Sequence, residues 1–171
     1  MAVLPIVIAP DPRLKVKTTP VDVVDDEVRK LMDDMIDSMH EAKGIGLAAP
    51  QIGDTRRVIV ADVAHEDEDP KPLRMVNPEI IDVSDDDNTY EEGCLSLPEY
   101  YADVVRPQWA KIKYLDENNE PAEILAEGLL ATCLQHEIDH LDGVLFVDHI
   151  SSLKRNMILR KLTKQKKQGL L

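Results

Sequence analysis

The run HEIDH, from His136 to His140, constrains this chain more than any other segment. It matches the HExxH pattern of metal-dependent hydrolases. On a helix, residues four apart lie about 40° apart around the axis and one turn along it, so both imidazoles face the same way. They can hold one metal ion, and Glu137 is placed to exchange protons with a metal-bound water. Because so short a pattern also arises by chance, other segments must supply the rest of the site.

A third metal ligand is expected, because catalytic sites usually take three protein ligands and leave one position for water. The common zinc peptidases place it downstream of HExxH, but here Asp148 and His149 fit that arrangement badly. Upstream, Cys94 in the run EGCLS offers a thiolate, a strong ligand for zinc or ferrous iron. A lone cysteine is more often a small buried hydrophobe. We nevertheless predict Cys94 as the third ligand.

The other cysteine, Cys133, shares a helical stripe with His136 and His140. It lies about 10.5 Å along the axis from His140, at about 1.5 Å per residue. One ion cannot bridge that span with ligand distances near ~2 Å. We therefore interpret Cys133 as a pocket or core residue.

The segment GIGLAAPQ, residues 44–51, forms an almost side-chain-free backbone. Such a backbone suits a substrate lying against the main chain. Gln51 closes it with a neutral amide donor, which is a suitable partner for a developing oxyanion. The alternative is a helix C-cap at Gly44 followed by an ordinary loop.

Together, GIGLAAPQ (44–51), EGCLS (92–96) and QHEIDHLDG (135–143) resemble the three motifs of the peptide deformylase family, in the same order and at similar spacing. The whole chain resembles the bacterial type with a C-terminal helix. The resemblance implies removal of the N-formyl group from the N-terminal Met of newly made polypeptides, with release of formate.

The resemblance also implies a set of site residues. The metal ligands are Cys94, His136 and His140. They hold one divalent metal per chain, with iron(II) favoured and zinc, nickel or cobalt also compatible with the ligands. A metal-bound hydroxide attacks the formyl carbon while Glu137 acts as general base and then acid. Gln51 and the Leu95 N–H stabilise the oxyanion.

Substrate contacts follow from the same resemblance. The backbone of Ile45 and Gly46 is expected against the peptide. The candidates for the apolar Met pocket, each equally compatible with plain core, are Ile45, Leu97, Leu129 and Cys133.

One position departs from some family members, which carry an Arg near the substrate pocket three residues after the SxP segment. Here Tyr101 takes that place. Arg106 is the alternative source of a guanidinium.

Composition bounds the class of protein. The 171 residues suit one domain spanning 1–171, and there is no apolar run of ~18 residues for a membrane span. Pro5 and Pro10, without a basic region, argue against a secretory signal. Two cysteines, one assigned to metal, argue against a disulfide. We expect a cytoplasmic bacterial monomer.

Charge is unevenly distributed along the chain. The net charge is −13, yet residues 151–171 hold seven of the 20 basic groups and none of the 33 acidic ones. Residues 1–150 therefore carry 13 basic and 33 acidic groups, or −20. A basic tail on an acidic body can seek a polyanion. By family resemblance, the helix expected over about 151–168 is a ribosome anchor; the alternative is a solvated helix face.

Hydrophobic spacing predicts an α+β class, with antiparallel sheets around the central HExxH helix and helices near both ends of the chain. The predicted helices are 25–43, 129–141 and about 151–168, and the predicted strands are 57–63, 75–83, 102–106, 109–115 and 122–126. Two other functions compete with a deformylase: a zincin-type metallopeptidase, and a non-catalytic ribosome-associated module with a structural metal.

Overall fold

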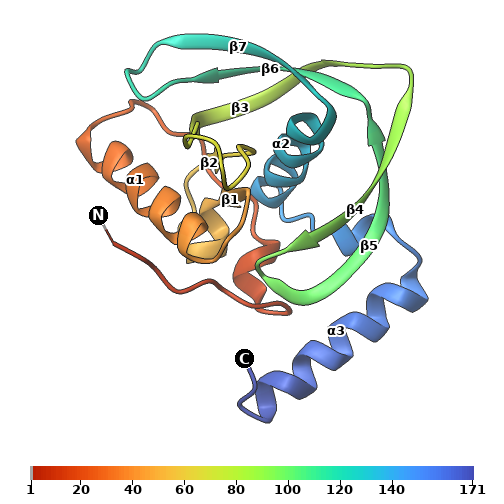
Figure 1. Cartoon of the computed structure of the whole chain (residues 1–171). Coiled ribbons are helices and arrows are strands. Elements are labelled where there is room, and N and C mark those ends of the chain that lie inside the picture. Colours follow the sequence, from red (N-terminus) through yellow and green to blue (C-terminus); the bar gives the residue numbers. More distant parts are fainter. Residues whose placement is uncertain (1) are drawn as a thin grey trace.

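In the computed structural model, which describes residues 2–171, α2 (Gly128–Leu141) lies between two antiparallel β-sheets (Figure 1). The larger sheet has the order β1-β2-β3-β6-β7, with β1 (Gly46–Ala48), β2 (Val58–Ala61), β3 (Leu73–Val83), β6 (Trp109–Leu115) and β7 (Pro121–Glu127). The smaller sheet pairs β4 (Asp87–Cys94) with β5 (Leu97–Pro107). Short 3-10 helices are η1 (Pro12–Lys15), η2 (Ala49–Ile52) and η3 (Phe146–His149). The predicted α+β class is confirmed.

The first helix, α1 (Asp26–Glu41), packs its apolar stripe against the larger sheet. Asp25 caps it, accepting a 3.0 Å hydrogen bond from the Val28 N–H. The helix ends at Glu41, short of the predicted residue 43, because Lys43 adopts a left-handed backbone with φ 58°. After this change of direction at Lys43, the chain continues into β1.

The central helix α2 is covered by both sheets, so nearly all of its side chains are buried. Its apolar residues pack against the larger sheet in one cluster. On another side of α2, the polar groups His136, Glu137 and His140 are 8%, 4% and 0% exposed. Burial of three titratable groups in one helix is costly unless partners compensate, so this surface of α2 marks the site.

The β4–β5 hairpin presents the EGCLS segment beside α2. Cys94 pairs with Leu97, so only Leu95 and Ser96 form the turn. Of this hairpin, only residues 102–106 are predicted as strand from the sequence. Strand β4 was missed because it begins with Asp87 and Asn88, which disfavour strands, and because much of it faces solvent.

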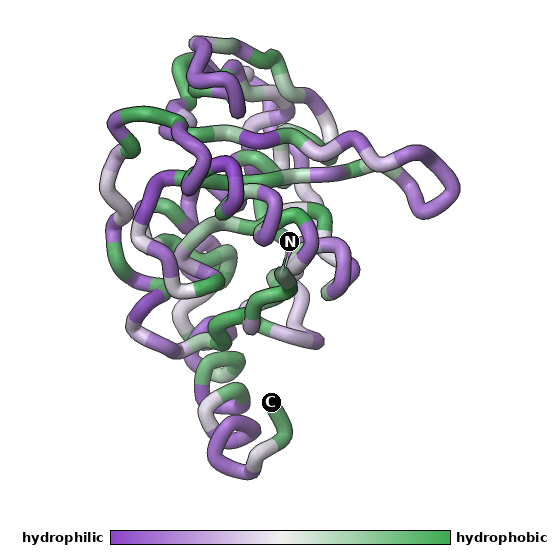
Figure 2. The backbone as a smooth tube through the Cα atoms, turned by 90° about the vertical axis from the view of Figure 1, so that its left-hand side faces the viewer, coloured by the Kyte–Doolittle hydropathy of each residue, from purple (hydrophilic) through white to green (hydrophobic). Residues whose placement is uncertain are grey.

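The last helix, α3 (Ser152–Lys167), projects from the body in both views (Figures 1 and 2). Ile158 and Leu162 fasten it to the apolar cluster beneath β5. The Tyr100 hydroxyl adds a 3.3 Å hydrogen bond to Gln165 Oε1. Within residues 2–171, no helix combines the length and apolar character needed to cross a membrane.

Candidate metal centre and active-site cavity

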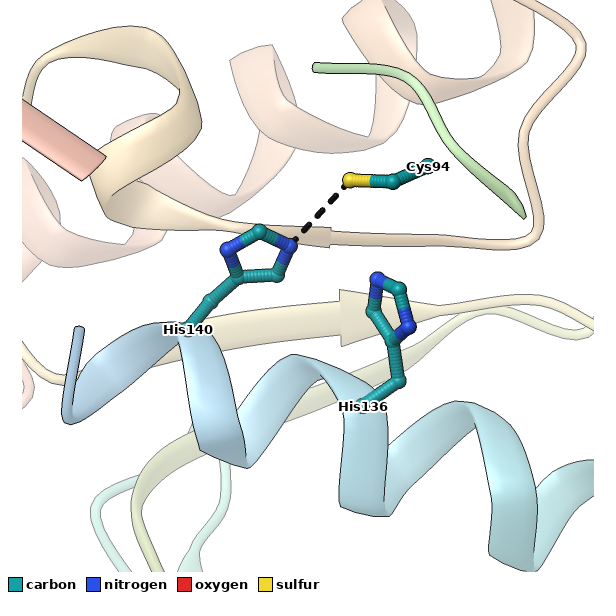
Figure 3. Close-up of side chains that lie close together, drawn as sticks. All are labelled: Cys94, His136 and His140. Carbon is teal, nitrogen blue, oxygen red and sulfur yellow. Dashed lines mark hydrogen bonds between the residues drawn. The ribbon is translucent and has the colours of Figure 1, made fainter. Parts of the chain in front are cut away.

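Three side chains from two elements converge between α2 and the β4–β5 hairpin (Figure 3). Cys94 comes from the end of β4, and His136 and His140 come from successive turns of α2. One ligand atom of each lies within 4.8 Å of the other two, and Cys94 Sγ is 3.3 Å from His140 Nε2. The structure thus brings together the three ligands expected from the sequence.

The donor set fits a divalent transition metal. Bonds of about 2.0–2.3 Å to tetrahedral ligands put neighbouring ligand atoms about 3.5 Å apart. The 3.3 Å between Cys94 Sγ and His140 Nε2 is close to this value, and all three atoms lie within 4.8 Å of one another. One thiolate and two imidazoles suit iron(II) or zinc. Glu137 Oε1 is also buried and has no hydrogen-bond partner within residues 2–171. Such an acceptor beside three ligands suits a proton-carrying water.

A carboxylate orients the first of the two histidines. Glu92 Oε1 lies 2.9 Å from His136 Nδ1, which leaves Nε2 as the ring nitrogen for a metal. Arg106 in turn donates to both Glu92 oxygens, at 2.7 and 3.1 Å, and to Asp139 Oδ2 at 2.8 Å. This network, which was not predicted from the sequence, fixes the orientation of the His136 imidazole through its Nδ1 atom.

Burial and charge set the protonation of these groups. Burial raises the pKa of Glu137 to about 7, so the carboxyl group can exchange protons near neutrality. Burial lowers the pKa of His140 well below its usual range, which favours the neutral, metal-binding imidazole. For His136, burial also acts downward, but the charge of Glu137 and the hydrogen bond to Glu92 raise its pKa well above the usual range.

Gln51 lies just after β1, in η2, and its side chain is 1% exposed. Its Oε1 accepts from the Ala48 N–H at 2.9 Å. Its Nε2 lies 3.1 Å from Ser96 Oγ and 3.4 Å from Cys94 Sγ. The amide N–H groups therefore face the metal ligands, on the side where Leu95 also lines the cavity.

A cavity of about 280 Å³ opens beside the cluster, with Cys94 and His136 in its lining. It is lined by Lys43, Gly44, Ile45, Gly46, Gln51, Tyr90, Glu91, Glu92, Gly93, Cys94, Leu95, Tyr101, Leu129, Thr132, Cys133, His136 and Glu137. Burial raises the pKa of the Cys133 thiol well above its usual range, so Cys133 is a neutral part of the wall. Three of the candidate pocket residues, Ile45, Leu129 and Cys133, thus line one cavity.

Leu97 does not line this cavity. It follows the two-residue turn, and its side chain is fully buried in the cluster that includes Phe146 and Leu162. The structure therefore places Leu97 in the core, outside the set of residues that line this cavity.

The structure places Tyr101 and Arg106, the two residues considered for the position of the pocket arginine, in different surroundings. Tyr101 lines the cavity and is 60% exposed, and it pairs across the hairpin with Gly93. Arg106 is 6% exposed and is engaged by Glu92 and Asp139. Tyr101 thus takes the place at the rim, and Arg106 does not substitute for the missing guanidinium.

The downstream ligand candidates of a zincin are engaged elsewhere. His149 Nε2 lies 2.8 Å from Asp139 Oδ2, and Asp148 pairs with Lys15 and Arg155. Neither belongs to the cluster of metal-ligating atoms. The geometry therefore opposes a zincin-type peptidase site.

Comparison with known proteins agrees with this geometry. The model of the family described as polypeptide deformylase matches residues 3–156. A peptide deformylase of Agrobacterium fabrum is 54% identical over 164 residues, which is 96% of each chain. The crystal structure of an Ehrlichia chaffeensis peptide deformylase superposes with a TM-score of 0.93 at 42% identity, covering 99% of this chain and 100% of that one. The same species' enzyme in complex with actinonin gives 0.92 at 44% identity, covering 96% and 98%.

Proposed function

This chain belongs to the polypeptide deformylase family and is a metal-dependent hydrolase that removes the N-formyl group from nascent peptides, and we propose which of its residues do so. The observation that carries the proposal is the convergence of a Cys-His-His cluster, a buried carboxyl group and a buried amide on one cavity. The proposed metal ligands are Cys94, His136 and His140. When bound, the metal would polarise the formyl carbonyl and lower the pKa of water, so that the water can be deprotonated and become a nucleophile near neutral pH.

Glu137 is the proposed proton carrier. Its buried Oε1 has no partner among residues 2–171, and its pKa is raised to about 7. It can accept a proton from the attacking water and pass it to the leaving amine, as a base and then an acid. The products are formate and a free N-terminal Met.

Gln51 and the Leu95 N–H are the proposed oxyanion donors. Gln51 Nε2 lies beside the Cys94 sulfur, at 3.4 Å, and Leu95 follows Cys94 in the hairpin turn. Both therefore sit next to the place where the formyl oxygen must lie. One good donor of this kind contributes roughly 3–4 kcal/mol to transition-state stabilisation.

The direction of the peptide follows from β1, which is an edge strand. The Asp62 N–H donates to the Ile45 carbonyl at 2.8 Å, so Gly46, one residue on, directs its N–H and C=O away from β2. A peptide that pairs with Gly46 and has its formyl end near Gln51 must run antiparallel to β1. Its downstream residues then leave past Ile45 and Lys43.

The Met side chain is placed in the apolar part of the cavity. We assign its walls to Ile45, Leu129 and Cys133, all of which line the cavity. The neutral thiol of Cys133 and the aliphatic groups suit a thioether.

Replacing Gly46 by Ala is expected to lower kcat/KM roughly 10²-fold, because such displacements of reacting groups are costly. An added Cβ would overlap Glu137 Oε2 and stand 2.8 Å from Cys133 Sγ. Steady-state hydrolysis of an N-formyl-Met peptide measures the effect. Gly169→Ala, whose Cβ would meet nothing within 4 Å, is the control. Unchanged kinetics in Gly46→Ala would contradict the inference that the close packing of Gly46 holds Glu137 and Cys133 in their working positions.

The overall function is tested by amine and formate release from a short N-formyl-Met peptide, with protein purified anaerobically and loaded with iron(II). Equimolar release of both products is expected. Metal analysis of a separate preparation, purified anaerobically without added metal, tests the proposal that the native metal is iron(II), one per chain. Absence of release with metal bound would favour a non-catalytic module. Because one chain supplies every residue named above, we also propose that the enzyme acts as a monomer. We propose that it does so in the cytoplasm.

We further propose that α3 contacts the ribosome. Its exposed cations include Arg160, Lys161, Lys164 and Lys167, on a helix that projects from an otherwise acidic body (Figure 2). Such a cationic surface suits the phosphates of ribosomal RNA.

Changing these four cations together to Gln should reduce the slope of log affinity against log salt by about one for each phosphate that α3 no longer neutralises. Cosedimentation with ribosomes over a salt series measures this slope, and hydrolysis of short peptides should not change. Deleting residues 151–171 is a less selective test, because Ile158 and Leu162 belong to the core. Equal affinity and slope in the Gln variant would rule out the anchor.

A further inference from the structure

The Gln51 amide is held at both of its polar atoms. Its Oε1 accepts from the Ala48 N–H at 2.9 Å, and its Nε2 donates to Ser96 Oγ at 3.1 Å. A backbone N–H can only donate, so the oxygen must face Ala48 and the nitrogen must face Ser96. From this geometry we propose that the Ser96 hydroxyl is a positioning group, which aims the second N–H of Gln51 at the formyl oxygen.

The number of N–H groups on the Gln51 amide explains why the contact with Ser96 orients it. The Gln51 amide has two N–H groups, and Ser96 takes one of them. The other lies on the side of Cys94 Sγ, at a longer 3.4 Å from this weak acceptor. It is therefore available to a stronger acceptor beside the metal ligands. The last torsion of a Gln side chain is broad, so an amide without the Ser96 contact would lose this aim.

Burial makes the contact hard to replace. Ser96 is 0% exposed and Gln51 is 1% exposed, so bulk water cannot take over the role of the hydroxyl. Ser96 also stands outside the set of cavity-lining residues, so it acts through Gln51 and does not touch substrate. This makes it a positioning residue and separates its role from that of Leu95, its neighbour in the turn.

The two backbones are held together independently of the hydroxyl. In the N-terminal segment, the Val7 N–H donates to the Gln51 carbonyl at 2.7 Å, and the Ala9 N–H donates to the Ser96 carbonyl at 2.8 Å. Val7 and Ala9 are themselves buried. Because these main-chain bonds remain in Ser96→Ala, that variant should keep its fold and lose mainly the orientation of the amide.

A double-mutant cycle on the metal-loaded enzyme tests this inference, which rests on the proposed oxyanion role of Gln51. Gln51→Ala should lower kcat roughly 10²–10³-fold. Ser96→Ala should lower kcat roughly tenfold, the scale of one neutral hydrogen bond, with KM within about twofold. In the Gln51→Ala background, Ser96→Ala should have almost no further effect, because the group it positions is gone.

A second readout does not depend on turnover. In the diamagnetic zinc form, labelled with nitrogen-15, the Gln51 side-chain amide signals are identified by their loss in Gln51→Ala. They should shift or broaden in Ser96→Ala and return towards their original positions in Ser96→Thr, which restores a hydroxyl. Ser84→Ala removes a different buried hydroxyl, which accepts from the Trp109 N–H at 3.2 Å, and should alter neither kcat nor these signals.

The outcomes separate this inference from the proposed function. A wild-type kcat in Ser96→Ala, or losses that multiply in the double variant, would overturn the positioning role while leaving the role of Gln51 intact. A wild-type kcat in Gln51→Ala would instead refute the oxyanion assignment, and this inference with it. A third outcome is that Ser96→Ala melts at a much lower temperature or loses metal, while Ser96→Thr keeps its stability, its metal and a normal kcat. In that case the hydroxyl is structural and the inference fails.

Discussion

Replacing Glu137 by Ala is expected to lower kcat by roughly 10³-fold, within the range for loss of a general acid and base. The carboxyl group is 4% exposed, and its Oε1 has no partner within residues 2–171. Burial raises its pKa to about 7, so the same group can serve as base and as acid near neutral pH. Glu92, the other carboxyl group buried at the site, cannot take this place in the variant, since it is occupied by His136 and Arg106.

The metal should remain in this variant, because Glu137 is outside the Cys-His-His cluster. Turnover of an N-formyl-Met peptide and metal per chain are therefore measured on the same preparation. Glu137→Gln, which keeps the size of the side chain but cannot carry the proton, should be as slow as Glu137→Ala. Substantial turnover in either variant, with metal bound, would contradict the proton-transfer role. Loss of metal in both would mean that Glu137 contributes to metal binding.

Two of the three expected metal ligands could be predicted from the sequence because their spacing along the chain is local. The i, i+4 spacing of His136 and His140 requires only that residues 129–141 be helical, and the structure has this helix as α2. Cys94 is more distant in sequence, and only its donor chemistry and family resemblance pointed to it. The helix and the hairpin then bring all three together.

The supporting residues were harder to predict because their partners are remote in sequence. Glu92 lies two residues before Cys94, so the period of a strand puts both on one face. That spacing was a usable signal for a carboxylate near the metal. Its partner Arg106 lies opposite Asn88 in the pairing of β4 with β5, four residues along β4 from Glu92, and only its long side chain reaches the Glu92 carboxylate. Without the register, Arg106 looked like a candidate for the cavity rim.

The burial of Leu97 in the core was hard to predict for a similar reason. Its position next to EGCLS suggested a pocket residue, but the two-residue turn at Leu95 and Ser96 reverses the chain before it. An apolar side chain after such a turn can face either the cavity or the core, and composition does not distinguish them. The cluster around Phe146, which buries Leu97, is built largely from segments outside the three motifs. Packing between remote segments therefore decided the outcome.

Replacing Cys94 by Ala is expected to abolish stable metal binding, with an affinity loss well beyond the roughly 10–100-fold typical of supporting residues. The variant keeps only His136 and His140, and two imidazoles on one helix do not close a three-ligand site. Loss of the metal also removes the polarisation of the formyl group, so hydrolysis should cease. Metal analysis after dialysis, with and without a competing chelator, measures the loss.

The second cysteine provides a matched control. Cys133 also borders the cavity, on the same helix as the two histidines, yet it lies outside the metal-ligating cluster. Its Sγ instead lies 3.5 Å from the Ile45 carbonyl, and its buried thiol has a pKa well above the usual range, so it is a poor source of thiolate. Cys133→Ala should therefore retain one metal per chain. Only a ligating thiolate makes the metal content depend on one cysteine and not on the other. Full metal retention in Cys94→Ala would therefore reject Cys94 as a ligand, and loss of metal in Cys133→Ala alone would assign the sulfur ligand to Cys133.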